Sequence, residues 1–151
     1  MTIGKRSGFI CLFLFSLVAC SQPNITIDKK NDVIVKEAGI SNLDKFEKFV
    51  LNVEQGEVDK IRIVHYTHEG DPVFQTLEYS GTDIIHMLDN RQDRFAGNHT
   101  DIDEDSCKRI VKEQRELQTA YRLIECVNEN GRNGYDLLYV PKNRVSRGRK
   151  F

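Results

Sequence analysis

Three aspartates at alternate positions have the spacing that comes nearest to a metal-binding motif in this chain. Asp101, Asp103 and Asp105 alternate like the opening ligands of a calcium-binding loop. The remainder of such a loop does not follow, because Ser106 stands where the turn needs glycine and Lys112 stands where a bidentate glutamate would complete the shell. We therefore interpret this stretch as a solvated acidic loop, with weak cation binding as the alternative, and predict no metal centre.

The four histidines could supply acid–base chemistry, but their spacing does not bring them into one site. His65 and His68 are three positions apart on an expected strand, so their side chains point to opposite faces. His65 and His86 approach one another only if their strands pair. The chain contains neither a nucleophile-elbow serine nor a glycine-rich phosphate loop. These observations give little support to an enzyme and predict no cofactor.

The thiol with the strongest sequence signal is that of Cys20. It follows Leu17-Val18-Ala19, an apolar run over residues 9–15, and a basic start at Lys5 and Arg6. The run is too short to span a membrane, which takes about 20 residues. The arrangement resembles the lipobox of bacterial lipoproteins, and the alternative is a plain signal peptide or a short anchor in which Cys20 has no role. We predict that residues 1–19 are a signal peptide and that Cys20 carries a two-chain lipid, which anchors the protein to the extracytoplasmic face of the cell membrane.

Two further cysteines, Cys107 and Cys126, remain once Cys11 leaves with the signal peptide and Cys20 is lipidated. Outside the cytoplasm, two remaining thiols usually form a disulfide. The loop that such a bond closes would stabilise the fold by about 3 kcal/mol in the chain-entropy model. No second cysteine pair or paired histidines complete a zinc site, so the sequence predicts a disulfide.

The charge is unevenly distributed along the chain. Residues 20–141 hold 15 basic and 23 acidic residues, whereas residues 142–151 hold five basic and no acidic residues. An acidic body argues against nucleic acid as a partner, since phosphate backbones bind cationic surfaces. The basic tail is either a disordered solubilising end or a second contact with anionic lipid.

One helix is expected near the start of the folded part. Residues 43–53 place apolar side chains at helical spacing, Ser41 or Asn42 supplies an N-cap, and Gly56 ends the helix. The preceding segment, residues 20–40, is interpreted as a mostly flexible tether with one possible short strand around Val33-Ile34-Val35.

Two hairpins are expected after the helix. Residues 60–68 and 72–79 alternate around a three-residue turn, which would place Ile63 opposite Leu77 and Arg62 opposite Glu78. A third strand is expected over 82–89, followed by a long polar loop over 90–106.

The second hairpin pairs residues 107–113 with 120–127. It would place Ile110 opposite Leu123 and the disulfide between adjacent strands. A helix through 112–119 is the alternative. With a last strand over 135–140, the sequence predicts an α+β domain over 41–141: one N-terminal helix packed on an antiparallel meander sheet of five or six strands.

Several strings in this region resemble an uncharacterised domain family found in lipoproteins of Bacillus-type Gram-positive bacteria. They are Leu43-Asp44-Lys45-Phe46, Lys60-Ile61-Arg62-Ile63-Val64, Glu69-Gly70-Asp71-Pro72-Val73-Phe74, Leu77-Glu78-Tyr79, Asp89-Asn90 with Asp93 and Phe95, and Cys107 with Cys126. The resemblance covers roughly residues 40–141. It implies a Gram-positive cell envelope and no assigned activity or catalytic residue.

Taken together, these features favour a small lipid-anchored binding or interaction module whose partner is an unknown protein or small ligand. Functional residues favour loops on a rigid scaffold. The candidate binding rim is therefore the polar segment and the first hairpin turn: Glu69, Asp71, Asp93, Asp101, Asp103 and Asp105. The alternatives are an envelope hydrolase that uses histidine and a carboxylate, and a protein of the protease-inhibitor or immunity type.

Overall fold

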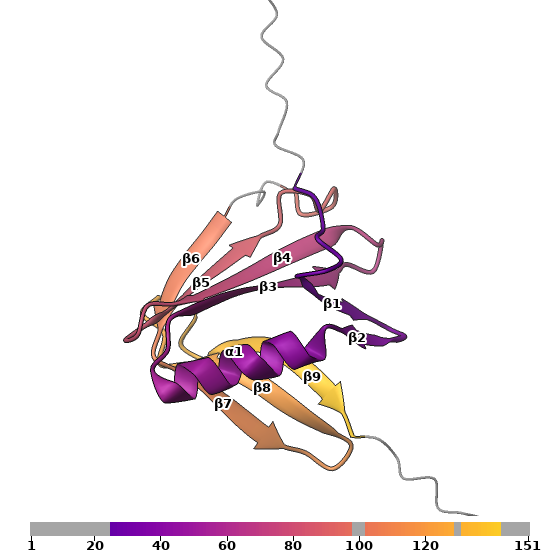
Figure 1. The fold of residues 1–151 in the computed structure, drawn as a ribbon. Helices are drawn as coiled ribbons and strands as arrows, with labels where there is room; N and C mark the ends of the chain where they lie inside the picture. Colours follow the sequence, from indigo (N-terminus) through magenta and orange to yellow (C-terminus); the bar gives the residue numbers. More distant parts are fainter. Residues whose placement is uncertain (1–24, 98–101, 129–130, 143–151) are drawn as a thin grey trace, which may run out of the picture.

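The computed structural model describes residues 25–97, 102–128 and 131–142, which form nine strands and one helix (Figure 1). In chain order these elements are β1 (Val33–Lys36), β2 (Gly39–Ser41), α1 (Leu43–Gln55), β3 (Asp59–Tyr66), β4 (Pro72–Tyr79), β5 (Ile84–Asp89), β6 (Ile102–Cys107), β7 (Arg109–Gln114), β8 (Gln118–Ile124) and β9 (Tyr135–Pro141).

The strands form two sheets rather than the expected single meander. One sheet has six strands in the order β2-β1-β3-β4-β5-β6, and the other has three in the order β7-β8-β9. Every pair of neighbours is antiparallel except β1 and β3, in which Val33 lies beside Ile63. A parallel pair needs a crossover connection, and β2 with α1 supplies it. The α+β class is therefore confirmed, whereas the purely antiparallel meander is wrong.

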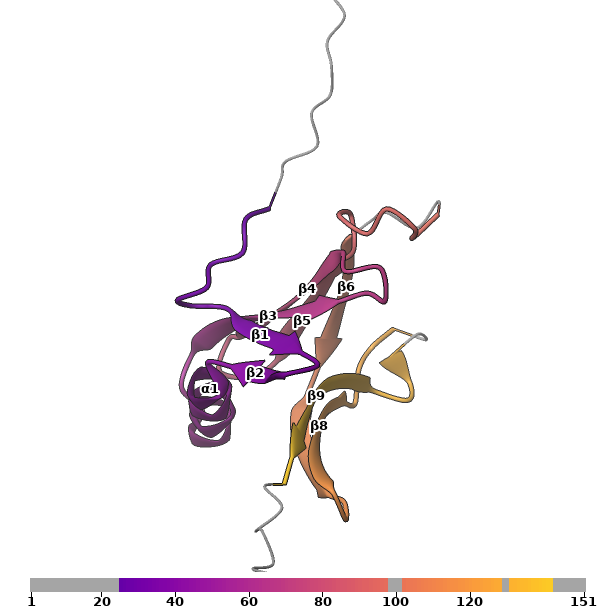
Figure 2. The ribbon, with the colours of Figure 1, turned by 90° about the vertical axis from the view of Figure 1, so that its right-hand side faces the viewer.

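The helix is confirmed, and it contributes to the core that joins the two sheets. It begins after Asn42 and ends at Gly56, and it buries Phe46 and Phe49 completely. The ring of Phe46 meets that of Tyr121 on β8 edge to face, with centroids 5.0 Å apart. In Figure 2 the sheets lie one above the other, with α1 beside them next to β1 and β2. The helix therefore covers one open side of the space between the sheets.

The side chain of Asn42 does not cap the helix as the sequence suggested. Its Nδ2 group donates to the carbonyl oxygens of Asp32, at 2.6 Å, and of Lys29, at 3.1 Å. The backbone of Asn42 is left-handed, with φ 56°, a conformation that asparagine tolerates better than most residues. This amide ties the start of α1 to the segment before β1.

The first hairpin has a longer turn than expected, and its predicted register is wrong by two residues. Ile61 lies opposite Leu77, because residues 67–71 form the turn. The Thr67 N–H donates to the Asp71 carbonyl at 2.9 Å and closes it. A shift of two positions keeps each side chain on its expected face. In the observed register, Glu78 forms an ion pair of 2.8 Å with Lys60 and not with Arg62.

The acidic segment expected to be part of a loop contains strand β6. It pairs with β5 and places Asp105 opposite His86. Along β6, Asp105 and Cys107 are buried, whereas Ile102 and Glu104 are exposed. The polar connection between β5 and β6 is therefore shorter than the predicted 90–106.

The second hairpin has the predicted register, with Ile110 opposite Leu123, so the alternative helix through 112–119 is wrong. Cys107 and Cys126 form a disulfide. Its position differs from the expectation, because Cys107 ends β6 of the larger sheet while Cys126 follows β8 of the smaller one. The bond therefore joins the two sheets.

The segment interpreted as a tether contributes β1 and β2 to the larger sheet, and Val33 is fully buried there. Cys20, Asp101, His99 and residues 143–151 of the basic tail lie outside the described residues. Within the described part of the chain, no helix combines the length and the apolar character needed to cross a membrane.

Candidate functional site

The structure separates the predicted acidic rim into two groups, and the first lies at the turn between β3 and β4. Asp71 is buried, and its carboxylate accepts hydrogen bonds from the backbone N–H and the Nε group of Arg94, at 3.1 and 3.0 Å. These bonds hold the pKa of Asp71 below its usual range. Asp93 accepts the N–H of Phe95, at 2.9 Å, and Glu69 is exposed in the turn. The Asp71 carboxylate therefore fastens the turn to the segment that follows β5.

The second group lies on β6, where Asp103 is exposed and Asp105 is buried. One oxygen of Asp105 accepts three backbone N–H groups, those of Ser106, Val127 and Asn128, at 2.8 to 3.1 Å. Its other oxygen accepts the hydroxyl of Tyr135 at 2.8 Å. Burial by itself raises the pKa of Asp105, but these hydrogen bonds outweigh it and hold the pKa below the usual value. Asp105 thus links β6 to the smaller sheet and has few lone pairs left for a ligand.

His86 lies directly against this group. Its ring stacks on that of Tyr135, with centroids 4.4 Å apart, and the residue is 2% exposed. Within the described residues its Nε2 atom has no hydrogen-bond partner. Burial lowers the pKa of His86 to about 4, against the attraction of Asp105 and Asp103. The adjoining cavity of about 80 Å³ is far smaller than the several hundred Å³ of ligand pockets.

Among the described residues, three potential metal ligands come within 4.8 Å of one another only at Asp105, Cys107 and Cys126. The two sulfur atoms are joined in the disulfide, so they are not available as thiolate ligands.

A larger, mainly apolar cavity lies at another point between the two sheets, and we call it the inter-sheet cleft. It measures about 380 Å³ and is bounded by β1, β3, β4 and β5 on one side and β9 on the other. Its apolar walls are formed by Val35, Tyr66, Val73, Leu88, Leu138 and Tyr139. A hollow beside the β1–β2 turn shares Val35, His65, Tyr66 and Thr67 with it. The inter-sheet cleft therefore adjoins a second hollow on this side of the molecule.

Four polar residues, His65, Thr67, Gln75 and Asp136, line the mainly apolar inter-sheet cleft, and two of them, His65 and Gln75, pair with each other. The amide nitrogen of Gln75 donates to the Asp136 carbonyl at 3.3 Å, so its Oε1 is free to accept from His65 Nε2, 3.1 Å away. Burial lowers the pKa of His65, although the bonds to Gln75 and to the Leu137 backbone oppose the effect. A neutral histidine paired with an amide thus provides a polar spot in an apolar wall, which is typical of ligand sites.

The carboxylate of Asp136 does not act on His65. It accepts Arg122 Nε at 2.7 Å and the Tyr139 hydroxyl at 2.6 Å. His65 and His86 lie on β3 and β5, with β4 between them, so the structure does not bring the two histidines together.

The sequence singled out His65 but missed the inter-sheet cleft around it. Gln75 offered a signal, because a polar side chain interrupts the apolar face that Val73 and Leu77 form on β4. The contribution of β9 to the cleft could not be predicted from the sequence, because no local pattern reveals which strands of two sheets face each other.

The fold and the inter-sheet cleft define a small two-sheet α+β protein with a ligand-sized apolar cavity. Residues 30–122 match the domain of unknown function DUF4362, and the chain belongs to this family. The match contains His65 and Gln75 and stops within β8, before β9. No curated protein and no solved structure matches the chain. The expected membership of an uncharacterised family is confirmed, while a lipoprotein origin in Bacillus-type bacteria stays a prediction.

Proposed function

We propose that the chain is a lipid-anchored binding protein of the bacterial cell envelope. Its inter-sheet cleft takes a small, mainly apolar ligand. The anchoring rests on the lipobox-like Leu17-Val18-Ala19-Cys20. The observation that carries the binding role is the cavity of about 380 Å³ between the sheets, within the size range of small-molecule sites.

The chemistry of the cleft indicates the kind of ligand. An apolar body would lie against Val73, Leu88 and Leu138, which gains free energy by removing apolar surface from water. One polar group of the ligand would reach the His65–Gln75 pair. A charged group is disfavoured there, because burial already keeps His65 from carrying its own charge.

Binding is favoured over the hydrolase alternative by the partners of the two buried histidines. The hydrolase alternative requires a histidine that meets a carboxylate and lies within reach of a substrate in a pocket. His65 borders the larger cavity but pairs with an amide, whereas His86 neighbours Asp105 but borders only about 80 Å³. Neither histidine combines both requirements.

Titration with the neutral fluorophore N-phenyl-1-naphthylamine tests the binding role. Val73→Phe places extra side-chain volume in the cleft and should weaken binding of the probe by about tenfold or more. Ile85→Phe makes a comparable change at a half-buried position on the opposite face of the same sheet and should leave binding unchanged. Absence of saturable binding by the unmodified protein, or equal affinity in the two variants, would refute the proposal. Circular dichroism checks that both variants are folded.

Metabolic labelling tests the anchor separately. Radiolabelled palmitate should enter the protein in bacterial cells, and Cys20→Ser should abolish the labelling and release the chain from the membrane fraction. Labelling that persists in Cys20→Ser rules out Cys20 as the lipid acceptor.

A further inference from the structure

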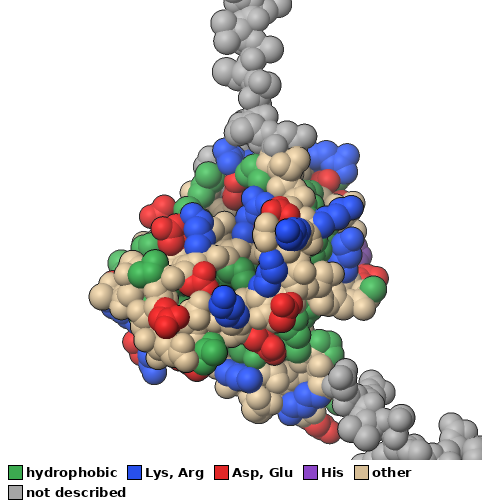
Figure 3. Space-filling model, in the orientation of Figure 1, with side chains coloured by type: hydrophobic (Ala, Val, Ile, Leu, Met, Phe, Trp, Pro, Cys, Tyr) green, Lys and Arg blue, Asp and Glu red, His purple; other side chains and the backbone are tan. Residues whose placement is uncertain are grey.

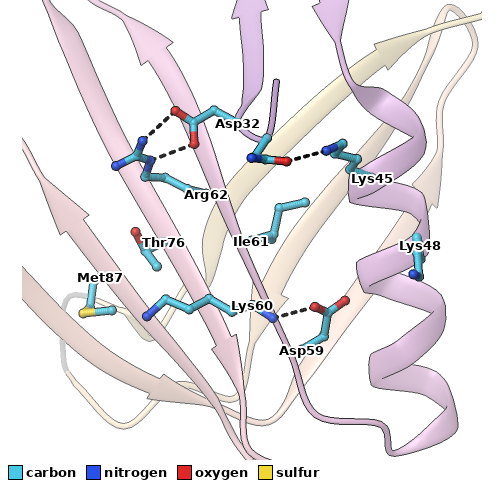
Figure 4. Close-up of a pocket in the computed structure, with 10 residues that line it drawn as sticks. Asp32, Lys45, Lys48, Asp59, Lys60, Ile61, Arg62, Thr76 and Met87 are labelled. Atoms are coloured by element: carbon cyan, nitrogen blue, oxygen red, sulfur yellow. Dashed lines mark hydrogen bonds and ion pairs between the residues drawn. The ribbon is translucent and has the colours of Figure 1, made fainter. Parts of the chain in front are cut away.

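Another hollow, distinct from the one beside the β1–β2 turn, lies at the open edge of β3, away from the inter-sheet cleft. Strand β1 pairs with β3 only at Ile63 and Val64, so on the side of β3 that faces away from β4 no described strand lies beside Asp59 to Arg62. The space there measures about 840 Å³. Its charged lining comes from α1, β3 and the segment before β1: Lys45, Lys48, Lys60, Arg62, Asp32 and Asp59 (Figure 4). We call it the β3-edge hollow.

Both carboxylates of the β3-edge hollow are occupied by partners within the protein. Asp32 binds the Arg62 guanidinium through two hydrogen bonds, at 2.9 and 2.7 Å, and accepts the Asp28 N–H at 2.7 Å. Asp59 accepts the side-chain amide of Asn52 and the N–H of Lys60, each at 2.7 Å. The charge of Asp32 is thus neutralised by Arg62. Of the carboxylates that line the hollow, Asp59 is the one whose negative charge reduces the positive charge of the three lysines.

The three lysines are largely available for a ligand. Lys45 donates to the neutral amide oxygen of Asn31, at 2.9 Å. In the described part of the chain, the Lys48 ammonium has no hydrogen-bond or ion-pair partner. Lys60 pairs with Glu78, but both side chains are about half exposed, and such pairs are weak. Figure 4 shows Lys45 reaching from α1 toward the segment before β1, whereas the Lys60 side chain extends from β3 away from the helix, on the side of Thr76 and Met87.

This concentration of positive charge contrasts with the rest of an acidic body. Residues 20–141 hold eight more acidic than basic residues, whereas the β3-edge hollow is lined by four cations and two anions. Figure 3 shows several lysine and arginine side chains on this face of the molecule, interspersed with aspartate and glutamate. A recess between low-dielectric walls strengthens the potential of the charges that line it.

We propose that the β3-edge hollow binds a phosphate group. Lysines of two elements, Lys45 and Lys48 on α1 and Lys60 on β3, line the hollow, and such donors suit an anion with several acceptor oxygens. The hydroxyl of Thr76 offers one further donor at the floor of the hollow. The phosphate belongs either to a lipid headgroup or to a small soluble phosphate.

The position of the predicted anchor makes a lipid headgroup reachable. Twelve residues lead from Cys20 to Asp32, and an extended chain of that length spans at most about 40 Å. This reach matters only if Cys20 is lipidated, whereas phosphate binding itself does not depend on the anchor or on the inter-sheet cleft.

Calorimetric titration of the full chain carrying Cys20→Ser tests the site. The two probes are inorganic phosphate and glycerophosphoglycerol, the free headgroup of phosphatidylglycerol. The double variant Lys45→Gln/Lys48→Gln should weaken binding by about tenfold or more. The matched control Lys36→Gln/Lys112→Gln removes the same charge outside the hollow and should change the affinity by less than about twofold.

Tighter binding of glycerophosphoglycerol identifies a lipid headgroup as the ligand, and tighter binding of inorganic phosphate identifies a soluble phosphate. The proposal is overturned if neither probe binds saturably. It is equally overturned if the control pair weakens binding as much as Lys45→Gln/Lys48→Gln, because the effect then follows from net charge alone.

Discussion

Mild acid should destabilise this fold through His86. Burial lowers the pKa of His86 from 6.5 to about 4. As the pH falls below 6.5, the imidazole takes up a proton in the unfolded chain but not in the folded one, so unfolding binds a proton and becomes easier. The stabilising contribution is therefore complete above pH 6.5 and is lost as the pH falls to about 4. A difference of this size between the two pKa values corresponds to about 3 kcal/mol.

Urea unfolding followed by circular dichroism at a series of pH values measures this loss. His86→Leu fills a similar space without a titratable group, so it should remove most of the decrease of about 3 kcal/mol between neutral pH and pH 4. His65→Leu should remove a smaller part, because burial also lowers the pKa of His65. An NMR titration of the His86 ring gives its pKa directly.

The carboxylates add to the decrease only at the acidic end of this pH range. Hydrogen bonds lower the pKa of Asp105 and of other carboxyl groups, and the stability that they contribute is lost from about pH 5 downward, so the effect of His86 is compared above pH 5. If His86→Leu keeps the full decrease of the unmodified protein between neutral pH and about pH 5, another group causes the decrease. A ring that titrates near 6.5 in the NMR experiment would refute the argument from burial.

Two further predictions concern stability at neutral pH. Gly56 and Gly134 share φ 75°, but a methyl group at Gly134 would overlap the backbone oxygen of Leu123, whereas Gly56 faces open space. Gly56→Ala should therefore cost about 1 kcal/mol and Gly134→Ala more than twice as much, measured by urea unfolding; equal costs would contradict the steric argument. The double variant Cys107→Ala/Cys126→Ala should lose about 3 kcal/mol. Dithiothreitol should lower the stability of the unmodified protein by a similar amount and leave that of the double variant unchanged.

Local patterns predicted the helix and the second hairpin well. The apolar spacing of residues 43–53 determines which face of α1 is buried, and Gly56 determines where it ends. The predicted register of the second hairpin, with Ile110 opposite Leu123, is the observed one.

The first hairpin shows the limit of the same method. A register shifted by two keeps every side chain on its face, so alternation could not distinguish the three-residue turn from the observed 67–71. The longer turn is stabilised by the Thr67–Asp71 backbone hydrogen bond and by the hydrogen bond from Arg94 to the Asp71 carboxylate. Neither contact could be inferred from the alternation of apolar and polar residues.

Long-range contacts account for the remaining differences. The sequence of β6, with its consecutive acidic residues, has low β-propensity. The strand forms because Asp105 finds four hydrogen-bond donors, three of them supplied by residues far along the chain or in the other sheet. Likewise, β1 pairs with β3 across a whole helix. Because the division into two sheets depends on such long-range contacts, the local sequence patterns could not predict it, nor the cleft between the sheets.

The two sheets are held together differently at His86 and at the inter-sheet cleft, and this difference favours the cleft as the ligand site. Around His86, the disulfide and the Asp105–Tyr135 hydrogen bond join the sheets. Beside the cleft, the Gln75 side chain makes a hydrogen bond of 3.3 Å to the backbone of β9, and His65 bonds to the Leu137 backbone of the same strand. A ligand in the cleft would contact both sheets where few strong bonds connect them. Its binding should therefore stabilise the fold by an amount that rises with the logarithm of the ligand concentration once that concentration exceeds the dissociation constant.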